Sequence, residues 1–110
     1  MKTLKFSKNL IPLILSGEKD ITWRLFDDKN LQVGDEIMFL DTKTKEPFTK
    51  VLLIEVQEKT FRDLTEEDKE GHEEFKDDEE MYKTYSDYYT TQIIPNTSLK
   101  VIKFKILEKL

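Results

Sequence analysis

The run Ser16-Gly17-Glu18-Lys19-Asp20-Ile21-Thr22-Trp23-Arg24 lies where a predicted helix passes into a predicted strand. Gly17 is expected to end the helix in the left-handed conformation that glycine adopts without steric cost. Over residues 21–26 the side chains alternate as they do along a strand, so Thr22 and Arg24 leave the same face. Lys19 stands at the entrance of that strand. An ammonium, a hydroxyl and a guanidinium are therefore expected to converge on one site.

The rest of the chain predicts strands joined by short turns, with few helices. Asn9 is a candidate cap for the first helix, and residues 33–35 form a candidate tight turn. Thr65 and Asp68 have the spacing of a capping box at the start of a later helix. Strands are expected at residues 2–6, 21–26, 36–40, 50–57 and 99–107, and the last helix at 78–89. This order favours a closed or nearly closed barrel.

The composition indicates one folded domain with an unevenly charged surface. The 110 residues fit a single domain, and the apolar residues gather in short runs. Residues 63–80 hold eleven acidic residues and two lysines, so the net charge of -5 comes from that region. It is therefore compatible with a basic cleft elsewhere in the protein. The absence of cysteine excludes disulfides and thiolate metal sites. The longest apolar run, residues 10–15, is far too short to span a membrane.

The run at residues 16–24 resembles the pattern of ASCH domains, a family of the PUA-like superfamily. In that pattern a helix ends in Gly-x-Lys and the next strand reads x-x-Thr-x-Arg. The turn Val33-Gly34-Asp35 and the apolar strand after it follow at the expected distance. Residues 64–68, the segment Glu70-Gly71-His72 and the tyrosine-rich helix resemble the helical insert of the family. The resemblance implies an α+β fold over residues 1–110, a PUA-like β-barrel of about five to six strands with two to three flanking helices.

The resemblance also implies a function for the converging side chains. Members of the family look like RNA-associated proteins, so the first expectation is a cleft that binds RNA, a nucleoside or a nucleotide through Lys19, Thr22 and Arg24. Some small single-domain members are amidohydrolases that deacylate N4-acetylcytidine with a Lys, a Thr and a Glu. These match Lys19, Thr22 and Glu70, and Glu67 and Glu73 stay alternatives to Glu70.

The amidohydrolase alternative has a definite mechanism. A desolvated Lys19 would take the proton of Thr22, whose oxygen would then attack the amide carbonyl. Glu70 would orient the amide or protonate the leaving amine. Arg24 or backbone N–H groups would stabilise the oxyanion.

Other residues carry weaker predictions. His72, the only histidine, is expected to line the same cleft as a ligand-binding residue, and a lone histidine is a poor metal site. No metal and no cofactor are therefore expected. Trp23 and the tyrosines of the last helix are expected to pack in the core, and an exposed tyrosine could instead stack on a base. A third hypothesis is that the acidic helices form a protein-interaction module for a basic partner. The protein is expected to be cytoplasmic and without membrane contact. The sequence leaves its oligomeric state open, with a monomer as the first expectation.

Overall fold

The structure is a computed structural model that describes residues 1–25, 29–70, 72 and 75–110. Its elements, in chain order, are β1 (Lys2–Phe6), the 3-10 turn η1 (Lys8–Leu10), α1 (Ile11–Ser16), β2 (Ile21–Arg24), β3 (Glu36–Asp41), β4 (Pro47–Thr60), the 3-10 turn η2 (Phe61–Asp63), α2 (Glu66–Glu70), α3 (Asp78–Tyr89) and β5 (Ser98–Lys109). Within the described ranges, no helix is both long and apolar enough to span a membrane.

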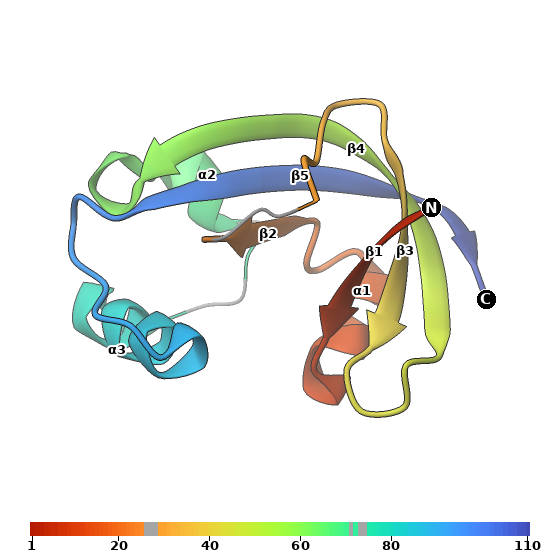
Figure 1. The fold of residues 1–110 in the computed structure, drawn as a ribbon, viewed down its shortest axis with the longest axis horizontal. Coiled ribbons are helices and arrows are strands. Elements are labelled where there is room, and N and C mark those ends of the chain that lie inside the picture. Colours follow the sequence, from red (N-terminus) through yellow and green to blue (C-terminus); the bar gives the residue numbers. More distant parts are fainter. Residues whose placement is uncertain (26–28, 71, 73–74) are drawn as a thin grey trace.

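The strands form one curved mixed sheet in the order β1-β3-β4-β5-β2. β1 runs parallel to β3, and the other neighbours are antiparallel. In Figure 1 the long strands β4 and β5 arch across the molecule, with α3 on one side of β2 and with β1 and α1 on the other. The sheet is a half-barrel flanked by helices, which confirms the expected PUA-like α+β fold. The edge strands β1 and β2 leave one side of it open.

β5 carries buried apolar side chains on both of its faces, so the structure has two cores. One core fills the half-barrel; among its residues are Leu4, Phe6, Ile14, Ile37, Phe39, Val51, Leu53, Ile102 and Phe104. The second core lies between β2, β5 and the helices; it comprises Ile21, Trp23, Phe61, Met81, Tyr85, Ile93, Leu99 and Val101. The alternation of β2 therefore sends Trp23 into the second core, as predicted.

Some boundaries differ from the sequence-based expectation. Asn9 does not cap α1, because it lies inside η1 and the N-cap position is Leu10, which makes no side-chain cap. β2 ends at Arg24, and the predicted end at Phe26 lies outside the described residues. β4 extends well beyond the predicted residues 50–57 because it pairs with β5 as far as Thr60. Gly17 ends α1 with φ 86°, and α3 has the predicted bounds.

The predicted capping box at Thr65 and Asp68 is present. The Thr65 N–H donates to Asp68 Oδ2 at 2.9 Å, and the Asp68 N–H donates to Thr65 Oγ1 at 3.2 Å. Lys59 on β4 adds an ion pair to the same carboxylate at 2.6 Å. Burial alone would raise the pKa of Asp68. The hydrogen bonds from Lys59 and Thr65, with the Lys59 charge, hold it below the ordinary value.

Replacing Asp68 with asparagine should destabilise the fold at neutral pH. It should also make the free energy of unfolding fall less steeply as the pH is lowered. The folded pKa lies below 3.8, so the carboxylate stabilises the fold above that value and loses this effect as the pH falls through the lowered one. The lost cap and ion pair should cost about 1 kcal/mol. Urea unfolding at neutral pH and at a pH below 3.8 measures the effect. Asp87→Asn, at an exposed position, is the matched control. If Asp68→Asn and the unmodified chain lose the same unfolding free energy on acidification, the Asp68 carboxylate does not have this role.

Candidate functional site

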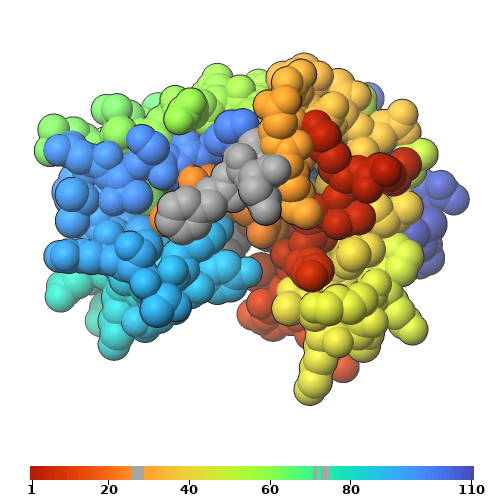
Figure 2. Space-filling view, viewed as in Figure 1, coloured from red at the N-terminus to blue at the C-terminus, as the bar shows by residue number. Residues whose placement is uncertain are grey.

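A cleft opens on the unpaired side of the half-barrel, with β2 as its floor. One wall comes from the end of β1 and η1 (Lys5, Phe6, Ser7 and Leu10), and the other from α3 (Thr84, Tyr85, Tyr88 and Tyr89). Lys19, Thr22, Trp23 and Arg24 line the space between the walls, which has a volume of about 80 Å³. Figure 2 shows the surface hollowed between the α3 region and the N-terminal segment. The three side chains predicted to converge therefore share one cleft.

Lys19 reaches the cleft because the chain turns back sharply after α1. Gly17 ends α1 in the left-handed region, and the Lys19 N–H then donates to the carbonyl of Leu13 at 3.0 Å. This turn buries the lysine side chain, which is only 2% exposed. Its Nζ donates to the carbonyl oxygen of Ile21 at 2.6 Å. The ammonium is thus held against the first residue of β2.

Arg24 bridges the open side of the half-barrel. Its Nη2 donates to the carbonyl oxygen of Lys5 at 3.1 Å, and its Cζ lies 4.8 Å from the centre of the Phe6 ring. Its Nε is buried and meets no hydrogen-bond partner within the described part of the chain. Thr22, two residues earlier on β2, is 4% exposed. The guanidinium therefore ties β2 to β1 and also keeps a donor at the cleft.

The tyrosines of α3, which were expected from the sequence mainly in the core, form one wall of the cleft. Tyr85 is buried, whereas Tyr88 is 60% exposed at the cleft. The Tyr89 hydroxyl accepts from the Leu25 N–H at 3.5 Å. Burial raises the pKa of Tyr89 above 10.0, against the opposing effect of the Arg24 charge, so the phenol stays neutral. The spacing of Tyr85, Tyr88 and Tyr89 on one helix face was the available signal for this wall.

His72 lies beneath the cleft, outside the residues that line it. Its ring stacks on Trp23 with centroids 3.9 Å apart and an interplanar angle of 16°. Its Nε2 lies 2.8 Å from the Tyr85 hydroxyl. His72 therefore touches two residues of the cleft, one on β2 and one on α3, and joins the floor to the wall.

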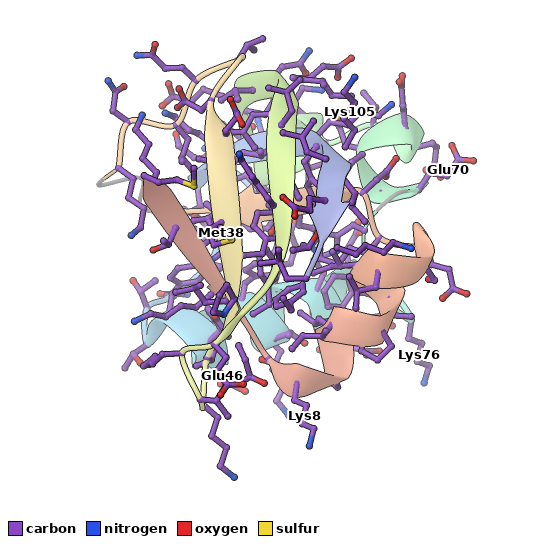
Figure 3. All side chains as sticks on the ribbon, turned by 90° about the vertical axis from the view of Figure 1, so that its right-hand side faces the viewer. Lys8, Met38, Glu46, Glu70, Lys76 and Lys105 are labelled. Carbon is purple, nitrogen blue, oxygen red and sulfur yellow. The ribbon has the colours of Figure 1, made fainter. Side chains whose placement is uncertain are left out.

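Glu70 lies apart from Lys19 and Thr22. It is exposed at the end of α2 and lines a separate hollow with Glu67, Asp20 and Lys103. In Figure 3 its side chain points outward from the body of the protein. Glu73 lies outside the described residues. The structure thus brings Lys19, Thr22 and Arg24 together but does not bring Glu70 or Glu67 into the same cleft. The described ranges also contain no group of three or more His, Asp or Glu side chains placed to hold a metal ion.

Comparisons with known proteins find the same fold. No family model matches the chain, and no curated protein matches it. Protein EF3133 from Enterococcus faecalis V583, of family DUF984, has a TM-score of 0.77 at 19% identity over 93% of this chain and 72% of its own. The ASCH domain from Lactobacillus crispatus JV V101 has a TM-score of 0.71 at 15% identity over 96% and 79%. Protein PF0455 from Pyrococcus furiosus has a TM-score of 0.67 at 24% identity over 97% of each chain.

Because these sequence identities are low, the comparisons show only that the chains share a fold. Both the half-barrel and the helices placed on it are shared with the solved ASCH domain. The sequence pattern around Lys19 and the spatial match therefore point the same way. The chain therefore has an ASCH-type, PUA-like α+β fold.

Proposed function

We propose that the cleft binds an RNA- or nucleotide-like ligand. The observation that carries the proposal is the composition of the cleft. Its described lining residues include the cations Lys5, Lys19 and Arg24 and no carboxylate, although the chain has a net charge of -5. A cleft lined by one sign of charge attracts the opposite sign, which for this cleft means an anionic ligand. Cations of this kind supply the phosphate contacts of nucleic-acid binding.

Aromatic side chains favour a nucleotide over a simple anion. Phe6, Tyr85, Tyr88 and Tyr89 line the same space, and bases stack on such rings. The volume of about 80 Å³ holds several waters but lies well below a whole-ligand pocket. One flat group therefore enters the cleft, and the rest of the ligand stays on the surface outside it.

Replacing Arg24 with methionine should weaken the binding of a short labelled single-stranded RNA by roughly tenfold, because a charge-assisted contact is lost. The slope of log affinity against log salt should fall by about 0.7. Fluorescence anisotropy over a series of salt concentrations measures both. Arg62→Met is the matched control, since Arg62 is the only other arginine and is exposed on η2. If both variants stay folded and lose the same affinity for the RNA, the cleft is not the binding site.

A second candidate function is hydrolysis of N4-acetylcytidine-like nucleosides. The observation that favours it is that Lys19 and Thr22, three residues apart in sequence, are both buried and line the same cleft. Thr22 would supply the nucleophile and Lys19 the base. No described glutamate lines this cleft, so the acid step would need another group, such as water.

Thr22→Val should abolish release of cytidine from N4-acetylcytidine while leaving nucleotide binding within a few-fold, because valine keeps the shape and loses only the hydroxyl. Chromatography of the reaction products measures turnover. Thr84→Val, on the α3 wall of the cleft, is the matched control. Turnover that survives in Thr22→Val, or that is absent from the unmodified chain at high enzyme concentration, would reject the hydrolase.

A further inference from the structure

The free edge of β2 faces the cleft, and its hydrogen-bonding register follows from two neighbouring contacts. The Phe104 N–H donates to the Asp20 carbonyl at 3.0 Å, and Thr22 is paired with Ile102 in the antiparallel ladder. Hydrogen-bonded pairs alternate with non-hydrogen-bonded pairs in such a ladder. The backbone groups of Thr22 therefore point toward β5, and those of Ile21, Trp23 and Leu25 point away from it.

Contacts at two of these outward-pointing residues confirm the direction. The Ile21 carbonyl accepts from Lys19 Nζ at 2.6 Å, and the Leu25 N–H donates to the Tyr89 hydroxyl at 3.5 Å. Both partners line the cleft. Trp23 lies between them and also lines the cleft. No hydrogen bond within the described ranges engages its backbone N–H or C=O. The floor of the cleft thus presents one donor and one acceptor side by side.

We propose that the backbone of Trp23 reads the hydrogen-bonding edge of a single nucleobase inserted into the cleft. The inference rests on the proposed binding of a nucleotide-like ligand and names the part of the ligand that enters. The Trp23 N–H donates to a ring nitrogen or carbonyl of the base, and the Trp23 C=O accepts from an adjacent N–H. Nucleobases carry such adjacent acceptors and donors on their Watson–Crick edges. Arg24 and Lys5 then lie toward the sugar and phosphate.

The pairing of a donor with an acceptor argues against an anion in this position. A phosphate would accept from the Trp23 N–H, but its charge would lie against the Trp23 carbonyl dipole, which repels it. A base satisfies both groups. The aromatic wall from α3 provides a surface on which its flat ring can stack.

An added peptide strand fits less well than a base. Strand addition needs a run of free backbone groups along an edge. β2 has only the residues Ile21–Arg24, and the outward groups on either side of Trp23 are already bonded to Lys19 and Tyr89. One free donor and one free acceptor suit a single planar group.

The test follows the backbone amides of the ¹⁵N-labelled full chain by NMR. Cytidine 5′-monophosphate should move the Trp23 amide resonance downfield and slow its hydrogen exchange. Ribose 5-phosphate, which keeps the sugar and phosphate, should move amides near Arg24 and leave Trp23 exchange unchanged. N4,N4-dimethylcytidine 5′-monophosphate, which lacks the exocyclic donor, should bind roughly tenfold more weakly because the Trp23 carbonyl is then buried without a partner.

The outcomes separate the two proposals. If cytidine 5′-monophosphate and ribose 5-phosphate bind equally and neither protects Trp23, the base-reading edge is wrong while an anion-binding cleft survives. If the dimethyl analogue binds as tightly as the parent, base readout by the carbonyl is also rejected. If no nucleotide moves any cleft amide, both proposals fail. A short peptide that protects the amides of Ile21, Trp23 and Leu25 together would replace the base with strand addition.

Discussion

Replacing Lys19 with methionine should lower the affinity for cytidine 5′-monophosphate by roughly tenfold to a hundredfold, because a hydrogen bond to a charged group is worth about 1.5–3 kcal/mol. The lysine is 2% exposed and its Nζ is fixed on the Ile21 carbonyl, so the charge is already positioned when the ligand arrives. Little side-chain entropy is then lost on binding. Water is excluded around it, which strengthens its attraction for an anionic ligand.

The same substitution should leave the chain folded. Methionine keeps the straight side chain, and removing a buried ammonium relieves its desolvation. The Ile21 carbonyl loses its donor, which costs about 1–3 kcal/mol. Isothermal titration calorimetry and urea unfolding measure binding and stability separately. Lys105→Met removes the same charge from an exposed position on β5, well away from α1 in Figure 3, and should change neither. A Lys19→Met variant that is folded and binds normally would exclude the ammonium from the site.

Replacing Trp23 with alanine should destabilise the fold by about 3–5 kcal/mol, the usual cost of truncating a buried tryptophan. The side chain is 2% exposed and stacks on His72, and its ring meets Phe61 edge-on at a centroid distance of 6.2 Å. Its Nε1 also donates to the Asp68 carbonyl at 3.3 Å. The indole therefore joins β2, α2 and the second core. Since small domains are stable by roughly 5–15 kcal/mol, this loss is a large share of the total.

Far-UV circular dichroism in urea measures this loss without relying on tryptophan emission. Tyr88→Ala is the matched control, because Tyr88 is aromatic but 60% exposed and should cost no more than about 0.5 kcal/mol. Trp23→Phe should fall between the two, because it keeps an aromatic ring in the stack and loses the indole N–H. If Trp23→Ala unfolds at the same urea concentration as Tyr88→Ala, the second core does not depend on this side chain.

The part of the site that could be predicted from the sequence is the part made by neighbours along the chain. Lys19 lies in the turn after the glycine that ends α1, and Thr22 and Arg24 lie two residues apart on β2, so the turn and the two-residue period place them together. The same local rules predicted α3 and the capping box. Local chemistry is enough for such features because each depends on only a few consecutive residues.

The rest of the site depends on packing between distant segments. Tyr85 reaches the cleft because it packs with Trp23 and His72 in the second core, and no local pattern states that pairing. The resemblance predicted Glu70 in the cleft. The position of α2 also depends on packing, and α2 carries Glu70 into a different hollow. The acidic carboxylates of α2 are largely exposed, and a basic protein partner for them stays a prediction.

The place of β5 between β4 and the edge strand β2 has a consequence for how the protein folds. β5 lies between β4 and β2, so the strand that carries the cleft residues has no ladder partner until residues 98–109 are available. Pairings between segments far apart in sequence are slow to form, because a long loop must close before the contacts stabilise it. The hairpin of β3 and β4 can form early from local contacts. We therefore expect the cleft to be complete only after β5 has paired with β2.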